Sequence, residues 1–144
     1  MSDDNQTEIP AENYPKIANY TFDLEEKLTS ILALRSQMGS DAFTAGHLGT
    51  EREGHGVLIS DNGLVLTIGY LITEADTIWL VDATGVATPA HTVGYDQETG
   101  FGLVQALGKL TVPHLPLGES SALRVGDPII IAGSGGIEKS VAAN

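Results

Sequence analysis

The chain has 144 residues, no cysteine, and 19 acidic against 7 basic side chains, which gives a formal net charge of −12. This length accommodates one domain with a hydrophobic core. The lack of cysteine excludes disulfides and thiolate catalysis. The negative charge opposes binding to phosphate backbones and anionic lipid surfaces, so we expect neither nucleic acid nor a membrane as a partner.

The N-terminal residues are polar and acidic, and they include Pro10 and Pro15. Residues 1–20 are therefore expected to form an acidic tail. Residues 1–10 lack the basic start and apolar run of a secretory signal, which predicts a cytoplasmic protein. Residues 23–28 predict a short amphipathic helix with acidic side chains in its first turn.

Short apolar segments separated by turn residues follow this helix. The sequences Asp61-Asn62-Gly63 and Ala83-Thr84-Gly85 are typical of hairpin turns. We expect a surface loop over residues 39–53. The strands are predicted at residues 29–38, 56–60, 64–71, 77–82, 87–95, 102–106 and 128–132.

These strands predict an all-β fold, an antiparallel barrel of six or seven strands over about residues 29–136. In residues 64–71 both the odd-numbered and the even-numbered positions carry apolar side chains, so the inward face of that strand is the hardest to assign. The predicted core residues are Val57, Ile59, Leu64, Leu66, Ile78, Leu80, Leu103 and Ile130.

Two longer motifs carry more information than the strand pattern. Residues 54–67 read GHGVLISDNGLVLT, and residues 115–133 read LPLGESSALRVGDPIIIAG. Both resemble the N-terminal barrel of trypsin-fold serine proteases of the high-temperature-requirement (HtrA) type, over about residues 54–136. The resemblance implies the N-terminal half of a double barrel, with this barrel at residues 21–137 and the start of a linker or second barrel at 138–144.

The resemblance also identifies where catalytic residues are expected. In the family, the residues that follow the threonine matched by Thr67 read N-x-H, and this histidine is the general base. Tyr70 occupies the position of that histidine here, and Gly100 occupies the position of the acidic triad member. A serine hydroxyl needs a base and an orienting carboxylate to attack a carbonyl. A phenol keeps its proton at neutral pH, and glycine has no side chain, so this pair predicts a noncatalytic domain.

Residues 133–136 read GSGG, which resembles the end of a trypsin-like nucleophile loop and makes Ser134 a weak catalytic candidate. Its position after an apolar strand favours an ordinary glycine turn instead. No metal or cofactor is expected, because the histidines lack the spacing of paired ligands. Of the four histidines, His47, His55, His91 and His114, the second is the best substitute base, since it lies in the hairpin that leads to Tyr70.

Three functional hypotheses remain open. The first is a noncatalytic binding or structural module that pairs with a C-terminal barrel of the same protein or with another copy, and that takes a peptide or protein ligand. The second is a serine endopeptidase completed by a C-terminal half. The third is a self-cleaving protein in which the side-chain amide of Asn144 attacks its own carbonyl.

Overall fold

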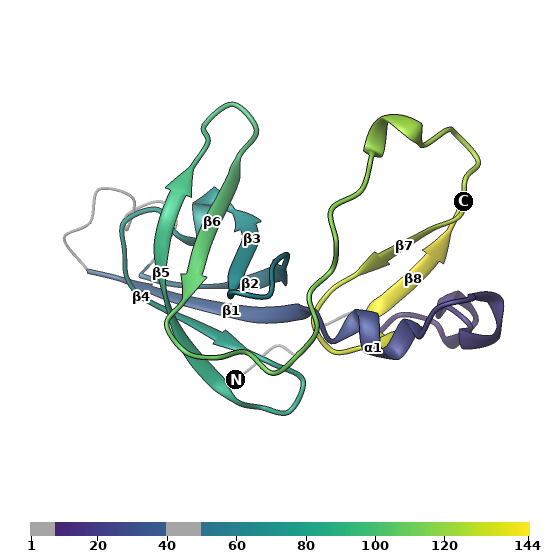
Figure 1. Cartoon of the computed structure of the whole chain (residues 1–144), viewed down its shortest axis with the longest axis horizontal. Coiled ribbons are helices and arrows are strands. Elements are labelled where there is room, and N and C mark those ends of the chain that lie inside the picture. Colours follow the sequence, from purple (N-terminus) through teal and green to yellow (C-terminus); the bar gives the residue numbers. More distant parts are fainter. Residues whose placement is uncertain (1–7, 40–49) are drawn as a thin grey trace.

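The structure is a computed structural model that describes residues 8–39 and 50–144. The chain forms a closed β-barrel and, beside it, a smaller lobe that contains the N-terminal segment and the last two strands (Figure 1). The predicted all-β fold with one short helix is confirmed. Within the described residues, no helix is both long and apolar enough to cross a membrane.

The N-terminal segment contains three short helical elements. Two of them are 3₁₀ turns, η1 (Ala11–Asn13) and η2 (Ile17–Asn19), and the third is the α-helix α1 (Leu24–Leu28). Asp23 caps α1, because its side chain accepts a hydrogen bond from the Glu26 amide at 3.1 Å. The helix predicted at residues 23–28 is therefore present.

Six antiparallel strands close the barrel in the order β1-β2-β3-β6-β5-β4. Because the barrel is closed, no strand of it presents a free edge. Their bounds are β1 (Ile31–Met38), β2 (Glu51–Leu58), β3 (Leu64–Ile68), β4 (Ala75–Val81), β5 (Ala87–Tyr95) and β6 (Phe101–Ala106).

Both predicted hairpin turns are present. The first joins β2 to β3, and its Gly63 has φ of +90°, a backbone conformation that favours glycine. The second joins β4 to β5 around Gly85, with φ of +86°. In this turn Asp82 accepts hydrogen bonds from the amides of Thr84 and Val86 and from the Thr84 hydroxyl.

Two predicted boundaries differ from the structure by three residues or more, the end of the strand at 64–71 and the start of the strand at 56–60. The strand predicted at 64–71 ends at Ile68, and residues 69–71 form the 3₁₀ turn η3 (Gly69–Leu71). Strand β2 begins at Glu51, so residues 51–53 belong to a strand and not to the predicted loop, while residues 40–49 of that loop lie outside the described residues. The charged sequence of residues 51–53 resembles a loop, but it pairs with β1.

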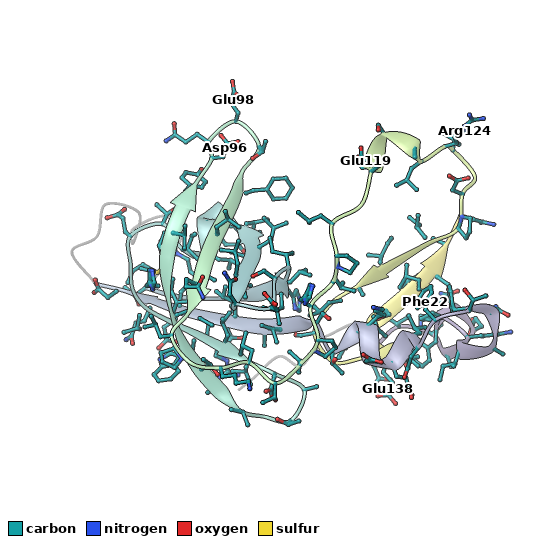
Figure 2. The ribbon with its side chains drawn as sticks, in the orientation of Figure 1. Phe22, Asp96, Glu98, Glu119, Arg124 and Glu138 are labelled. Carbon is teal, nitrogen blue, oxygen red and sulfur yellow. The ribbon has the colours of Figure 1, made fainter. Side chains whose placement is uncertain are left out.

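The last predicted strand lies outside the barrel. Strand β7 (Ile129–Ala132) pairs with β8 (Ser140–Ala143) in a separate two-stranded sheet. A long connection, residues 107–128, leads to it and carries the 3₁₀ turn η4 (Ser120–Ala122), and Glu119 and Arg124 lie at its outer end (Figure 2). Between β7 and β8 the chain forms another 3₁₀ turn, η5 (Ile137–Lys139).

The barrel core consists of aliphatic side chains from all six strands and from η3. The prediction was right for Ile78 and Leu80, which are buried. It was wrong for the faces of β3 and β6, where Val65 and Val104 point inward in place of Leu66 and Leu103. Apolar residues on both parities made the sequence ambiguous there. The buried cluster contains Leu32, Leu34, Leu58, Val65, Leu71, Ile72, Ile78, Leu80, Ala90, Val104 and Ala106.

A second, smaller apolar cluster holds the two lobes together. Leu24 and Leu28 of α1 and Ile31 at the start of β1 are buried there. Val57 of β2 and Ile130 of β7 pack against them and are partly buried. The β7–β8 hairpin is thus attached to the barrel through side chains on one of its faces.

Candidate functional site

The turn that carries Tyr70 is held by donors from two neighbouring strands. Arg52 of β2 is only 4% exposed, and its Nη1 donates to the carbonyl oxygens of Tyr70 at 2.6 Å and Thr73 at 3.1 Å. The hydroxyl of Ser36 on β1 donates to the carbonyl of Leu71. Sequence reasoning missed Arg52, because the three consecutive charged residues 51–53 show no alternation of apolar and polar side chains that would indicate a strand.

The turn that carries Gly100 lies directly beside the Tyr70 turn. The Gly69 amide donates to the carbonyl of Gly100 at 2.6 Å. Gly100 has φ of +79°, and a Cβ atom built there would meet no atom within 4 Å. There is room for a side chain at this position, but the backbone favours glycine. The two positions therefore face each other without presenting either an imidazole or a carboxylate.

Exposed apolar side chains surround these two positions. Ile68, Tyr70, Tyr95 and Phe101 are each 46% to 50% exposed, and together we call them the Tyr70 face. Tyr95 lies against the backbone of Gly69, where an added Cβ would come within 1.8 Å of its ring. A glycine at position 69 is what allows the aromatic ring to pack on the turn.

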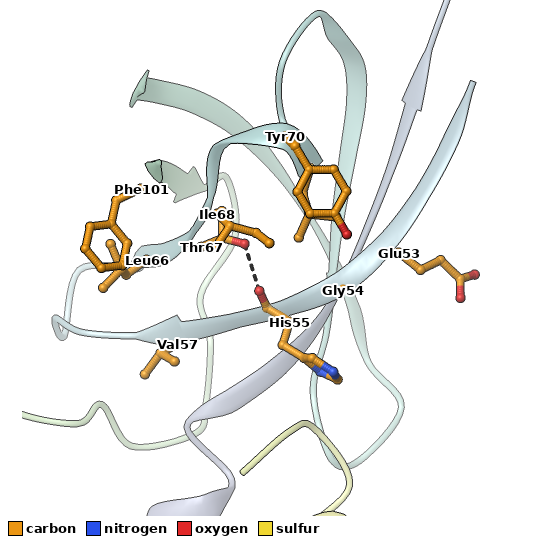
Figure 3. Close-up of a pocket in the computed structure, with 10 residues that line it drawn as sticks. Glu53, Gly54, His55, Val57, Leu66, Thr67, Ile68, Tyr70 and Phe101 are labelled. Atoms are coloured by element: carbon orange, nitrogen blue, oxygen red, sulfur yellow. Dashed lines mark hydrogen bonds between the residues drawn. The ribbon is translucent and has the colours of Figure 1, made fainter. Parts of the chain in front are cut away.

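A cavity of about 490 Å³ opens at the Tyr70 face (Figure 3). Its titratable lining groups are Glu53, His55 and Tyr70, and most of its wall is apolar. A second hollow of about 410 Å³ shares Leu66 and Phe101 with it. The first cavity is lined by Glu53, Gly54, His55, Val57, Leu66, Thr67, Ile68, Tyr70, Leu71 and Phe101.

The structure brings His55 and Ser134 together although they lie 79 residues apart in the sequence. His55 Nδ1 lies 2.9 Å from Ser134 Oγ and accepts a hydrogen bond from the Ser134 amide at 3.1 Å. The imidazole points away from the ring of Tyr70 (Figure 3). His55 therefore does not replace the missing base beside Tyr70 and Gly100.

The Ser134 contact also differs from a nucleophile and its base. An imidazole nitrogen that accepts has a single lone pair, and the Ser134 amide already donates to that nitrogen. The Ser134 hydroxyl would therefore have to donate to the same lone pair of Nδ1 as the Ser134 amide. A general base needs a free lone pair to take the proton of the nucleophile.

The remaining candidates lie apart from the Tyr70 face. His91 on β5 and His114 in the 107–128 connection are exposed, whereas His47 lies outside the described residues. Asn144 is exposed immediately after β8, on the smaller lobe (Figure 1). In residues 8–39 and 50–144, no three His, Asp or Glu side chains gather in a way that could hold a metal ion.

Comparison with known sequences shows where the chain has relatives. Residues 54–144 match the family model of the trypsin-like peptidase domain. A probable periplasmic serine endoprotease, DegP-like, of Pseudomonas putida is 35% identical over 81 residues, 56% of this chain and 17% of the relative. The serine protease Do-like HtrB of Bacillus subtilis is 27% identical over 140 residues, 93% of this chain and 31% of the relative.

The chain thus spans less than a third of the length of these relatives. Solved structures of HtrA-type proteases share its fold. The protease AlgW with a tripeptide has a TM-score of 0.65 and 24% identity over 82% of this chain and 34% of that chain. A serine endoprotease from Yersinia pestis has a TM-score of 0.58 and 20% identity over 76% of this chain and 36% of that chain.

These relatives contradict the predicted cytoplasmic location. The DegP-like relatives of three Pseudomonas putida strains are named periplasmic. The prediction rested on the composition of residues 1–10 alone. The composition of these ten residues describes the local chemistry of that segment, and it does not determine the compartment of the protein.

Proposed function

Because this chain belongs to the trypsin-like peptidase domain family, we propose that it is the N-terminal barrel of an HtrA-type domain that has exchanged catalysis for binding. The observation that carries the proposal is the pair of turns at Tyr70 and Gly100. Their backbones are hydrogen-bonded to each other through the Gly69 amide, yet neither position has a side chain suited to the base or acid role.

The surroundings of these positions support a binding role. The positions where a catalytic protease carries its base and acid are surrounded here by the aromatic and aliphatic Tyr70 face and its cavity of about 490 Å³. Contiguous apolar surface of this kind marks interaction sites more often than free surface. We propose that the C-terminal barrel of the same polypeptide covers the Tyr70 face, and that the domain so formed binds a peptide or protein ligand.

The length of the relatives supports this choice of partner, because they extend far beyond the span that this chain covers. Burial of the Tyr70 face by a second barrel would stabilise the first by linkage. Sedimentation of the 144-residue chain tests the alternative partner. We expect a monomer at micromolar concentration. A stable dimer that Tyr70→Ser dissociates would show that a second copy covers the Tyr70 face, and it would overturn the proposal that a C-terminal barrel covers it.

A serine endopeptidase is the second candidate function, and the names of the relatives favour it. The contact between Ser134 and His55 is the one arrangement of nucleophile and base that the described residues offer to it. The self-cleavage hypothesis for Asn144 stays a prediction, which mass spectrometry of the mature protein would test.

A fluorophosphonate probe separates the two candidates, since it labels an activated serine. We expect no labelling of the 144-residue chain and the same result for Ser134→Ala, because the lone pair of His55 Nδ1 is engaged by a backbone amide. Labelling that disappears in Ser134→Ala and in His55→Ala would overturn the proposal. Labelling that persists in both variants would identify a different nucleophile and would also overturn it.

A further inference from the structure

The turn between β7 and η5 contacts His55 of the barrel. This turn, residues 133–136, is joined to His55 of β2 by the Ser134 amide at 3.1 Å, and Ser134 Oγ lies 2.9 Å from the same nitrogen. Gly133 lies against the edge of the ring, since a Cβ there would be 3.1 Å from Cε1 and 3.2 Å from Nε2. The imidazole is therefore seated between the barrel and the turn.

The direction of the hydrogen bond fixes the protonation state that it needs. A backbone N–H can only donate, so Nδ1 of His55 must accept, and an acceptor nitrogen carries no proton. In the neutral ring the proton then resides on Nε2. A protonated imidazole has two N–H donors and no acceptor, so the same contact would place two donors face to face.

We propose that His55 and Ser134 form a pH-sensitive latch, which holds the 133–136 turn on the barrel while His55 is neutral and releases it when His55 is protonated. The proposal rests on the contact itself and does not depend on the proposed function. Histidine is the side chain whose charge ordinarily changes between pH 5 and 8.

The charged groups nearest His55 lie on β1 and β2. Glu53 precedes His55 by two residues on β2, and Arg35 lies opposite Glu53 on β1, where Ala33 is the residue opposite His55. The side chains of Arg35 and Glu53 pair at 3.4 Å, and both are more than two-thirds exposed. The 133–136 turn contributes no charged side chain, and Tyr70 is the other titratable group of the cavity that His55 lines. His55 is itself exposed, so protons reach it directly.

Release would be local. Ile130 and Ala132 of β7 still pack on the cluster around Leu24 and Leu28, whose buried members are all aliphatic. Opening of the latch therefore frees the turn while β7 stays attached. A small hollow of about 250 Å³, which Ser134 and His55 line together, would widen as the turn leaves.

Amide hydrogen exchange of Ser134, measured by NMR and expressed as a protection factor, tests the latch. In the 144-residue chain we expect protection to fall about tenfold between pH 8 and pH 5, the size expected for the loss of one hydrogen bond. His55→Asn keeps an acceptor oxygen that does not titrate, so its protection should not change with pH. His55→Ala should show low protection at both values.

The matched control is His91→Asn, which alters an exposed histidine on β5 and should preserve the pH response of Ser134. The amide of Leu80 in the barrel serves as an internal reference. Protection of Ser134 that does not change between pH 8 and pH 5 in the wild-type chain would overturn the latch. So would an equal fall in His55→Asn, because that variant has no imidazole to protonate.

Discussion

Arg52 is the side chain that holds the Tyr70 turn most directly. A buried guanidinium beside two backbone carbonyls replaces the contacts that a turn of this kind otherwise finds in water. The turn keeps its shape through β1 and β2, and no catalytic side chain is needed to maintain it. A fixed backbone without catalytic groups is what a binding surface requires.

The first prediction concerns Arg52→Met. The change leaves two part-buried carbonyl oxygens without this donor, so the free energy of unfolding should fall by about 1 to 3 kcal/mol. Urea denaturation measures it. The matched control is Arg35→Met, which removes an exposed ion pair with Glu53 and should cost no more than about 0.5 kcal/mol. Equal effects of both changes would contradict the assigned role of Arg52.

The second prediction concerns Gly69→Ala. The new methyl group would overlap the Tyr95 ring, so the free energy of unfolding should fall by about 1 to 3 kcal/mol. In a Tyr95→Ala background the same change should cost less than about 1 kcal/mol, which a double-mutant cycle measures. Gly94→Ala, where a Cβ meets nothing within 4 Å, is the control. Absence of coupling between positions 69 and 95 would show that the ring does not pack as described.

The sequence predicted the residues of the site unevenly. Tyr70 and Gly100 were identified because the flanking motifs keep register, and the structure indeed brings their turns together. Arg52 was missed because three consecutive charged residues resemble a loop. The pairing of His55 with Ser134 joins residues 79 apart, and no local pattern encodes a contact of that separation.

At the scale of elements, the β4–β5 hairpin depends on a single carboxylate. Asp82 is buried, and its pKa is lowered from 3.8, first by the Thr84 hydroxyl and further by the amides of Val86, Thr84 and Gly85, against the opposing effect of burial. A lowered pKa in the folded state means that the ionised form stabilises the fold.

The third prediction follows from this sign. The stabilisation by ionised Asp82 is fully present above the pKa of the unfolded chain, and it is lost as the pH falls from about 4 through the lower pKa of the folded state. Asp82→Asn should therefore destabilise the chain at pH 7 and progressively less below pH 4. Urea midpoints at pH 7 and pH 3 measure this; a difference from wild type that stays constant or grows toward pH 3 would contradict it.

Elements were predictable where local chemistry decides them. The Asn62-Gly63 turn and the short helix at residues 23–28 follow from residue types, and both were found. Strand β7 was recognised as a strand but placed in the barrel, because the sequence does not show with which strand it pairs. The inward face of β3 was not decidable, since Leu64 and Leu66 are as apolar as Val65.

At the scale of the whole molecule, the barrel closes without β7 and β8. Its core is complete with six strands, while Leu66, Ile68, Phe101 and Leu103 remain on its outer side. The smaller lobe is held beside it by the cluster at Leu24 and by the His55 contact. The barrel thus has a complete core and exposed apolar side chains on its surface, which agrees with the proposal that a second barrel packs against it.

The central claim is that this barrel belongs to a protein without peptidase activity, and casein hydrolysis by the full-length natural protein tests it most directly. Because neither Tyr70 nor Gly100 offers a base or an orienting acid, we expect hydrolysis no faster than in the buffer blank, and the same result after Tyr70→Phe. Saturable hydrolysis that a fluorophosphonate abolishes would contradict the account, whichever residues supply the chemistry.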